Sequence, residues 1–434
     1  MVFLTEGLSV NKGHLKINGC DAVDLAHEFG TPLYVMNENA IRNRCVEYKK
    51  SIEDYCGGSG KGKIIYASKA FSCLEIYRIM RDEGLGIDVV SEGELYTALK
   101  ANFPARDIHF HGNNKTFNEL FMAVKNNVGR IVLDNFCELK MLEKICSEYG
   151  KKIDIAMRIK PGVSAHTHEF IRTGQIDSKF GFAIETGEAM RAIKYIGQID
   201  QINLKELHCH IGSQIFDVEP FVLAAQVMMD FISSIRSEIG ITIKELNLGG
   251  GFGIAYTKND NPPSCEDYMK FISKAIREKA RDFNLPMPYL YLEPGRSIVG
   301  EAGVTLYTVG AIKEIPNIRT WVSIDGGMCD NPRYALYRSD YTALIANKVE
   351  KDNDFKVTIA GKCCESGDLI QENAWIPKPK PGDIMAIIST GAYNYSMASN
   401  YNRIPKPAVV MLKDGKARLI VKRQTLDDLL KNDL

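Results

Sequence analysis

The sequence predicts an α/β protein in which a TIM-like (β/α)8 barrel is joined to a mostly antiparallel β domain. Eight short apolar runs alternate with helical patterns over the first two thirds of the 434-residue chain. After about residue 298 the pattern changes to alternating segments separated by turn residues. We therefore expect a barrel over residues 36–298 and a β domain built from residues 1–35 and 299–434.

The barrel is predicted from the apolar runs and from the residues at their carboxyl ends. The runs are KIIYAS (63–68), GIDVVS (86–91), DIHFHG (107–112), RIVLDN (130–135), KIDIAMRI (152–159), LKELHCHI (204–211), KELNLGGG (244–251) and PYLYLEPG (288–295). Helical patterns lie between them, as in 91–101 and 264–283. An open doubly wound sheet is the competing arrangement. Polar or glycine-rich residues recur at the carboxyl ends of the runs, which in a barrel share one face and carry the chemistry. These are Lys69, Ser91, His111, Asn135, Arg158, His210, the triple glycine and Glu293.

The β domain is predicted from alternating segments in the last third of the chain. They cover residues 304–315, 320–327, 355–361, 383–390 and 408–422. Asp414-Gly415 within the last segment is a strong hairpin signal. Residues 14–19 and 31–37 also resemble strands, and we expect them to join this domain.

Charge and hydropathy argue against a nucleic-acid-binding protein and against a membrane protein. Formal net charge is zero and no long basic or acidic block occurs, so the footprint of a nucleic-acid-binding protein is missing and a small-molecule ligand is expected. The start of the chain lacks a signal-peptide pattern and no stretch has the apolar length of a membrane span, which favours the cytoplasm. Eleven cysteines without CxxC spacing predict neither a disulfide framework nor a zinc site. We expect no metal.

Lys69 and the glycine run 249–253 are the first candidates for chemistry. A lysine that ends a short apolar strand is placed to form an imine with a carbonyl compound. The run GGGFG comes after the seventh strand, where glycines let backbone amides approach a phosphate and a helix start next to it would add favourable polarity. A glycine-rich turn without ligand is the alternative, although phosphate sites of barrels typically occur after strands seven and eight.

The motif EPGR (293–296) and two histidines supply further candidates. Glu293 is suited to keep a pyridine nitrogen protonated, and Arg296 to bind phosphate or carboxylate, although an internal Glu-Arg ion pair is the alternative. His208 and His210 alternate along the sixth run, and we expect one to point into the barrel and the other toward the helices. We favour His210 for stacking on a flat cofactor ring. A lone histidine on a strand is otherwise most often a hydrogen-bonded core residue.

The motif CESGD (364–368) lies far from the barrel in the sequence. The thiol of Cys364 can donate a proton to a carbanion, and Glu365 can bind a substrate ammonium group. A structural cysteine beside a solvated turn is the alternative, and for this motif alone it is the better one.

Together these motifs resemble the diaminopimelate decarboxylase family, fold-type III pyridoxal-phosphate enzymes related to the ornithine and arginine decarboxylases and more remotely to alanine racemase. The resemblance runs from CDAVDLAHEFGTPLYV (20–35) to MASNYNRIPKP (397–407). It implies pyridoxal 5'-phosphate as cofactor and a homodimer whose active sites are shared between subunits. The implied reaction converts meso-diaminopimelate, at its D-configured centre, to L-lysine and carbon dioxide.

The resemblance also assigns residues. Those implied to bind the cofactor are Lys69, His210, Ser213, Gly250, Gly251, Glu293, Arg296 and Tyr393. Those implied to bind substrate are Arg296, Arg333, Tyr337, Glu365 and Tyr393. Those implied to be catalytic are Lys69, His210, Glu293 and Cys364, with Cys364 and Glu365 reaching in from the partner chain. Either Cys364 or the freed Lys69 is the candidate final proton donor. The segment 168–182 resembles one that borders the substrate in the family and receives no role.

Some positions depart from the family pattern, and rival functions stay open. Glu92, Tyr334 and Tyr341 replace residues common in the family, without removing any residue that has an assigned role. One rival is a related decarboxylase acting on ornithine, arginine or a carboxylated polyamine; Arg333 argues against it, because a simple diamine tail prefers an acidic pocket. Another rival is a catalytically inactive regulatory homologue. Loss of the lysine or the cysteine would mark such a protein, and this chain has both Lys69 and Cys364. A racemase is disfavoured, because nothing resembles its tyrosine base.

Overall fold

The computed structural model describes residues 3–58, 60–163 and 177–434. The chain forms two compact units. We call the first the barrel unit, which comprises Arg44–Gly253 and Pro262–Gly295. The second, the β unit, comprises Met1–Asn43, Ile254–Asn261 and Arg296–Leu434. The division into domains at residues 36 and 298 stays a prediction, which limited proteolysis would test.

Eight parallel strands close into a barrel, as the sequence predicts. They are β5 (Gly62–Ala67), β6 (Gly86–Val89), β7 (Ile108–Phe110), β8 (Arg130–Leu133), β9 (Ile153–Lys160), β11 (Ile202–His208), β12 (Glu245–Asn247) and β13 (Tyr289–Leu292). The ring closes through the pairings β13–β5 and β8–β9, and every pairing in it is parallel. A two-residue strand, β10 (Phe182–Ala183), pairs with the end of β9 and was not predicted.

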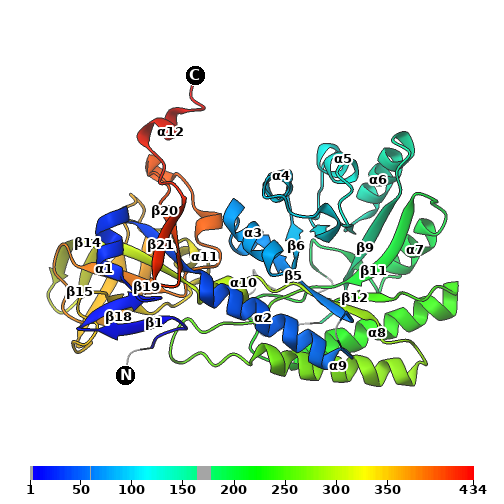
Figure 1. Ribbon diagram of the computed structural model, residues 1–434, viewed down its shortest axis with the longest axis horizontal. Helices are drawn as coiled ribbons and strands as arrows, with labels where there is room; N and C mark the ends of the chain where they lie inside the picture. The colour runs from blue at the N-terminus through cyan, green and yellow to red at the C-terminus, as the bar shows by residue number, and fades with distance from the viewer. Residues whose placement is uncertain (1–2, 59, 164–176) are drawn as a thin grey trace. The chain divides into compact units, whose positions relative to one another are not determined.

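Helices alternate with the barrel strands along the chain and cover them on the outside (Figure 1). They are α2 (Glu38–Tyr55), which precedes β5, and α3 (Leu74–Asp82), α4 (Glu92–Lys100), α5 (Phe117–Lys125), α6 (Phe136–Glu148), α7 (Glu188–Ile196), α8 (Glu219–Ile239) and α9 (Cys265–Asp282). Because helices cover one face of the strands and the packed interior covers the other, strands such as β8 are buried along their whole length. This explains why these strands appear in the sequence as continuous apolar runs.

Two of the predicted polar residues at strand ends are helix caps. The Ser91 side chain accepts a hydrogen bond from the backbone amide of Glu94 at the start of α4. Asn135 does the same for Glu138 at the start of α6. Capping satisfies amides that the first turn of a helix leaves without a partner, so these two residues have a structural explanation.

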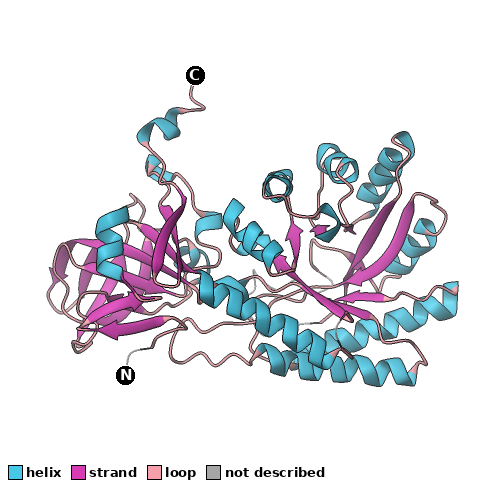
Figure 2. Cartoon of the chain, viewed as in Figure 1, coloured by secondary structure: helices cyan, strands magenta, loops and turns pink. Residues whose placement is uncertain are grey.

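The β unit is built on a nine-stranded sheet that appears as a dense group of magenta arrows in Figure 2. Its strands are β4 (Leu33–Asn37), β14 (Gly303–Ile315), β15 (Arg319–Ile324), β16 (Ala343–Ile345), β17 (Phe355–Ala360), β18 (Leu369–Ile376), β19 (Ile384–Ile388), β20 (Ala408–Lys413) and β21 (Lys416–Val421). The main path runs β18-β17-β15-β14-β4-β20-β21, and β19 joins β14 to β16. Pairing is antiparallel except for β15–β17 and β4–β20. The sequence did not predict β18.

Smaller elements complete the β unit. They are a three-stranded sheet of β1 (Leu8–Asn11), β2 (His14–Ile17) and β3 (Cys20–Asp21), and the helices α1 (Ala22–Phe29), α10 (Arg296–Val299), α11 (Arg333–Tyr337) and α12 (Leu426–Leu430). The predicted hairpin joins β20 to β21, and Asp414 and Gly415 have φ angles of 50° and 72°. Both central residues of the turn are thus left-handed, as a type I′ turn requires.

All eleven cysteines are free thiols in the structure. Within the described part of the chain, none of the helices combines the length and the apolar character needed to cross a lipid bilayer.

Candidate active site

Lys69 lies at the open carboxyl-terminal end of the barrel. Strand β5 ends at Ala67, and Lys69 is the middle residue of the 3₁₀ turn Ser68–Ala70. Its side chain is exposed, whereas Ser68 and Ala70 on either side are buried. The ammonium group interacts electrostatically with the buried carboxyl of Asp88 on β6 and with His210. Lys69 is therefore an accessible amine at the catalytic face of a barrel, beside acidic and basic groups.

The end of strand β13 places Glu293 at the centre of a buried hydrogen-bond cluster. Oε1 accepts hydrogen bonds from His111 Nε2 at 2.9 Å and from Asn247 Nδ2 at 2.8 Å. Oε2 accepts one from His208 Nε2 at 3.1 Å. An ionised carboxylate only accepts hydrogen bonds, so both imidazoles carry their proton on Nε2. Each carboxylate oxygen has two lone pairs, and Oε2 therefore keeps one that these three donors do not use.

Burial and hydrogen bonding fix the charges in this cluster. Burial raises the pKa of Glu293, but the imidazoles of His111 and His208 and their hydrogen bonds outweigh it and hold that pKa well below its usual range. Burial lowers the pKa of His111 to about 4, and it lowers that of His208 as well. A negative carboxylate held by neutral donors is thus the stable state of the cluster near neutral pH.

His210 lies just beyond strand β11 and belongs to the same region as His208. Its Nδ1 accepts a hydrogen bond from the backbone amide of Gly250 at 3.2 Å. Burial, together with the neighbouring Lys69 ammonium, holds the pKa of His210 well below its usual range. The expectation that His208 and His210 point to opposite sides was wrong. Residues two positions apart on an extended chain share a face, and both imidazoles interact with Glu293.

The glycine run comes directly after β12 and packs against neighbouring strand ends. A Cβ atom on Gly250 would lie 2.1 Å from the carbonyl oxygen of Glu293. A Cβ atom on Gly251, whose φ is +112°, would lie 2.4 Å from the carbonyl oxygen of Gly212. Close backbone approach therefore requires both glycines whether or not a phosphate binds. Ser213 lies in the loop after β11 and is half-buried. The expected helix start directly after the run was wrong, because residues 252–264 are not helical and α9 begins at Cys265.

The predicted anion-binding residues of the β unit gather around Tyr256, a residue that was not predicted from the sequence. The phenol oxygen of Tyr256 accepts a hydrogen bond from Arg296 Nη1 at 2.5 Å and another from Arg333 Nη1. The Arg296 guanidinium lies 4.7 Å from the ring centroid of Tyr393, and the Arg333 guanidinium lies 5.9 Å from that of Tyr337. Arg296, Arg333 and Tyr256 are all buried. Two adjacent buried cations make this cluster suited to anionic ligands.

Cys364 and Glu365 do not join this cluster. Both are exposed, in the loop between β17 and β18. The backbone amide of Cys364 donates to Asn402 Oδ1 at 2.7 Å, and Glu365 Oε1 accepts from the amide of Gly367 at 3.1 Å. Asp368 of the same motif is buried and accepts from the amides of Met328 and Cys363. Exposed side chains on a loop fixed by its backbone are available to another molecule.

Several residues of the barrel cluster were not predicted as site residues. Asp88, His208 and Asn247 lie in runs that the sequence identified as strands, and His111 ends one of them. Their polar character inside apolar strands was the signal that could have found them. Tyr256 offered no such signal, because it lies in the irregular segment 254–261. The segment 168–182, which resembles a substrate-bordering segment, lies outside the described residues up to position 176.

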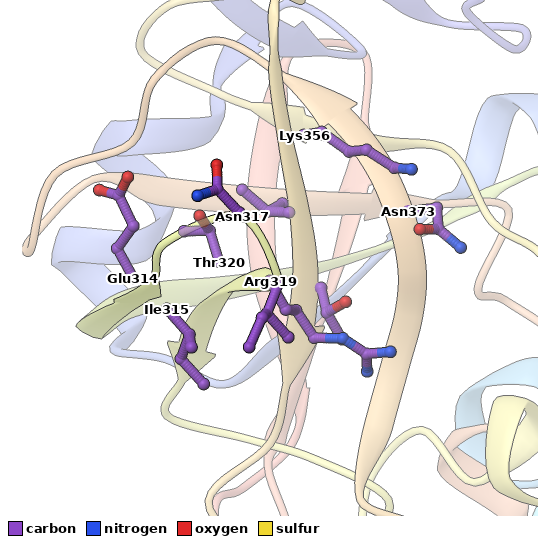
Figure 3. A pocket seen from close by; sticks show the side chains of 10 residues that line it. Glu314, Ile315, Asn317, Arg319, Thr320, Lys356 and Asn373 are labelled. Carbon is purple, nitrogen blue, oxygen red and sulfur yellow. The ribbon is translucent and has the colours of Figure 1, made fainter.

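Two further features of the described residues are a group of potential metal ligands and a hollow on the surface. One potential metal-ligating atom from each of His109, His111 and Glu293 lies within 4.8 Å of the other two. The hydrogen bond between His111 Nε2 and Glu293 explains the proximity of those two residues. A shallow hollow of about 280 Å³ lies on the β unit, beside Asn317, Arg319 and Lys356 (Figure 3). None of the predicted site residues lines it.

Comparison with known proteins identifies the family. Residues 38–300 match the family described as "Pyridoxal-dependent decarboxylase, pyridoxal binding domain". The chain is 50% identical over 422 residues to the diaminopimelate decarboxylase of Bacillus subtilis, covering 97% of this chain and 95% of that one. It is 49% identical to that of Staphylococcus aureus, covering 97% and 98%.

Solved structures agree with the sequence comparison. The crystal structure of diaminopimelate decarboxylase from M. jannaschii in complex with L-lysine is 39% identical and superposes with a TM-score of 0.93, covering 100% of this chain and 99% of that one. The predicted fold class and the family resemblance are thereby confirmed. The chain belongs to the diaminopimelate decarboxylase family of pyridoxal-dependent decarboxylases.

Proposed function

We propose that this protein decarboxylates meso-2,6-diaminopimelate at its D-configured centre, with release of L-lysine and carbon dioxide, as the last step of lysine biosynthesis. The observation that carries the proposal is identity of 42–50% over nearly the whole chain to enzymes named for this reaction. The buried pair Arg296 and Arg333 supports it, since a substrate with two carboxylates needs cations to receive them.

The barrel unit fits pyridoxal 5'-phosphate as cofactor. Glu293 is held ionised by three donors, and the lone pair left on Oε2 can accept a hydrogen bond from a protonated ring nitrogen. Lys69 provides an accessible amine for covalent attachment. His210 is a neutral imidazole beside that amine and would stack on the ring. The proposed phosphate contacts are Ser213, Gly250 and Gly251 of the barrel unit and Arg296 of the β unit, with Tyr393 closing the site.

The proposed substrate contacts come from the β unit. Arg296, Arg333, Tyr337 and Tyr393 would receive the carboxylates, because the two guanidiniums supply several N–H donors. Glu365 would bind the distal ammonium group. Since Cys364 and Glu365 are exposed on their loop, we propose that they act in the site of a partner subunit, so that the active form is a homodimer with shared sites.

When bound, pyridoxal phosphate supplies an electron sink for the charge that the departing carboxylate leaves behind. Glu293 favours this by holding a proton at the ring nitrogen through its negative charge. Arg333 would orient the substrate by binding one of the substrate carboxylates. Either the Cys364 thiol or the Lys69 amine then delivers a proton to carbon. We further propose that the enzyme works in the cytoplasm.

The test is to incubate the purified protein and pyridoxal phosphate separately with meso-diaminopimelate, L-ornithine and L-arginine, and to quantify carbon dioxide and the product amine. Lysine from the first substrate alone is the expected result. Release from ornithine or arginine instead would keep the family and overturn the substrate. No release from any of the three would favour a non-catalytic role.

A further inference from the structure

We propose that Tyr256 is a positioning residue that fixes the spacing of Arg296 and Arg333, and so the spacing of the two anionic groups that they receive. The inference rests on the proposed function for the identity of these anions. It concerns residues of the β unit alone, because Tyr256 belongs to the segment Ile254–Asn261 of that unit.

The Tyr256 ring and backbone are held in place on several sides. The backbone amide donates to Asp260 Oδ2 at 3.0 Å, and the backbone oxygen accepts from Thr342 Oγ1 at 3.0 Å. The ring contacts Tyr341 edge-on, with 5.3 Å between centroids, inside a buried apolar cluster. The phenol oxygen is therefore a fixed point in the unit.

Both guanidiniums are tied to that fixed point. Because both guanidiniums donate a hydrogen bond to the same oxygen, their donor nitrogens lie within about 6 Å of each other. Like charges so close repel each other in a buried environment, and a shared acceptor is what offsets the repulsion. Arg333 is also held by a hydrogen bond from Nη2 to Ser339 Oγ at 3.0 Å. Without the phenol oxygen the two long side chains would lose their common anchor.

The hydrogen bonds at Tyr256 point to a ligand rather than to packing alone. A neutral phenol has two lone pairs, which the two guanidiniums occupy, and one O–H proton, for which the described residues offer no acceptor. Nε of Arg333 is likewise a buried donor without a partner among the described residues. A carboxylate bound at Arg333 would supply the missing acceptor. Buried donors are normally hydrogen-bonded, so these two unused donors favour a bound ligand.

The two guanidiniums also change the pKa of the phenol. Burial raises the pKa of Tyr256, but the charges of Arg296 and Arg333 outweigh it, so that its pKa is lowered overall. The charged and titratable groups that face the hydroxyl are Arg296 from α10, Arg333 from α11 and Tyr341.

The test compares Tyr256→Phe with Tyr341→Phe as a matched control. Tyr341 is a buried tyrosine of the same cluster whose hydroxyl is bonded to Asn394 and to neither guanidinium. For each holoenzyme we would measure KM and kcat for meso-diaminopimelate, the affinity of the apo form for pyridoxal phosphate, and the pH titration of phenolate absorbance. Thermal unfolding would show that both variants fold.

For Tyr256→Phe we expect KM to rise by about tenfold or more, as for a lost hydrogen bond to a charged group, with a smaller change in kcat. In Tyr256→Phe the affinity for pyridoxal phosphate should fall, and the phenolate transition that occurs at the lowest pH should disappear. In Tyr341→Phe both the cofactor affinity and this transition should stay as in the wild type. A Tyr256→Phe variant whose KM and cofactor affinity match those of the control would overturn the inference. If the wild type fails to decarboxylate diaminopimelate, the proposed function falls, and the cofactor-affinity and titration measurements then decide on Tyr256 separately.

Discussion

Glu38, the first residue of α2, offers the sharpest test of how the β unit is held together. Its buried carboxylate accepts hydrogen bonds from Arg42 at 2.8 Å, from Lys413 at 3.0 Å and from Arg418 at 2.6 Å. The last two residues belong to the hairpin β20–β21. Glu38→Gln keeps the shape of the side chain and removes the charge that three cations share.

The pKa of Glu38 gives the size of the effect. Burial raises this pKa, but the hydrogen bonds and charges of Arg418, Arg42 and Lys413 outweigh it and lower it from 4.5 to about 2. Each pKa unit corresponds to about 1.4 kcal/mol, so the ionised form contributes about 3 kcal/mol to folding as an upper limit. Screening at the partly exposed Lys413 and Arg418 reduces this to about 2 kcal/mol.

The lowered pKa also sets the sign of the pH dependence. Above pH 4.5 both the folded and the unfolded states are ionised, so the full contribution is present there. As pH falls toward 2 the unfolded state takes up the proton first, and the contribution is progressively lost. The wild type should therefore exceed Glu38→Gln in stability near neutral pH and lose this advantage in acid.

Tryptophan fluorescence can monitor this prediction in the β unit alone. The chain has two tryptophans, Trp321 on β15 and Trp375 on β18, and the barrel unit has none. Denaturant unfolding measured by this signal should give the stability difference at several pH values. Asp433→Asn is the matched control, since Asp433 lies in the same unit and forms an exposed pair with Arg403. A difference under about 0.5 kcal/mol at neutral pH, or one independent of pH, would refute the reasoning.

The remaining predictions concern catalysis. Lys69→Ala should abolish turnover and the visible absorbance of covalently bound cofactor while circular dichroism stays unchanged; continued lysine production would contradict the mechanism. Cys364→Ala should slow turnover strongly without loss of cofactor, and an unchanged rate would remove Cys364 from the mechanism. Mixing the Lys69→Ala and Cys364→Ala proteins under conditions that exchange subunits should restore up to about a quarter of wild-type activity, because half of the dimers would then hold one intact site; no recovery would argue against shared sites. Glu293→Gln should retain bound cofactor, measured after gel filtration, but lower kcat by about 100-fold or more because a preorganised charge is lost; a wild-type rate would show that the carboxylate does not act on the ring.

The barrel could be predicted because its strands are buried on both faces. A run such as Arg130–Leu133 is buried at every position, and its four residues are too few for a helix of ordinary size. β18 was missed because LIQENAWI (369–376) mixes buried and exposed positions without clean alternation. β10 has only two residues, too few for any pattern. Local sequence therefore predicts buried strands well. It predicts strands poorly where they are very short or where buried and exposed residues do not alternate.

The site was predictable where one residue type implies one chemistry, and not where the chemistry depends on contacts distant in sequence. Lys69, Glu293 and Arg296 could be selected individually. That Glu293 is held by His111, His208 and Asn247 depends on the closure of the barrel, which brings β7, β11, β12 and β13 together. For the glycine run the sequence left a phosphate site and a turn without ligand as alternatives, and it could not show that backbone packing requires Gly250 and Gly251.

The position of β4 has a consequence for how the chain is made. This strand lies between β14 and β20, so the earliest strand of the sheet waits for partners that come after the whole of the barrel. During synthesis the barrel can fold as it emerges from the ribosome, while the five residues of β4, all buried in the finished protein, have no partner on either edge. A nascent chain that stalls before residue 303 should therefore expose β4 as an unpaired, aggregation-prone strand attached to a folded barrel. The nascent chain should need chaperones until the hairpin β20–β21 has been translated, because β20 is the last partner of β4.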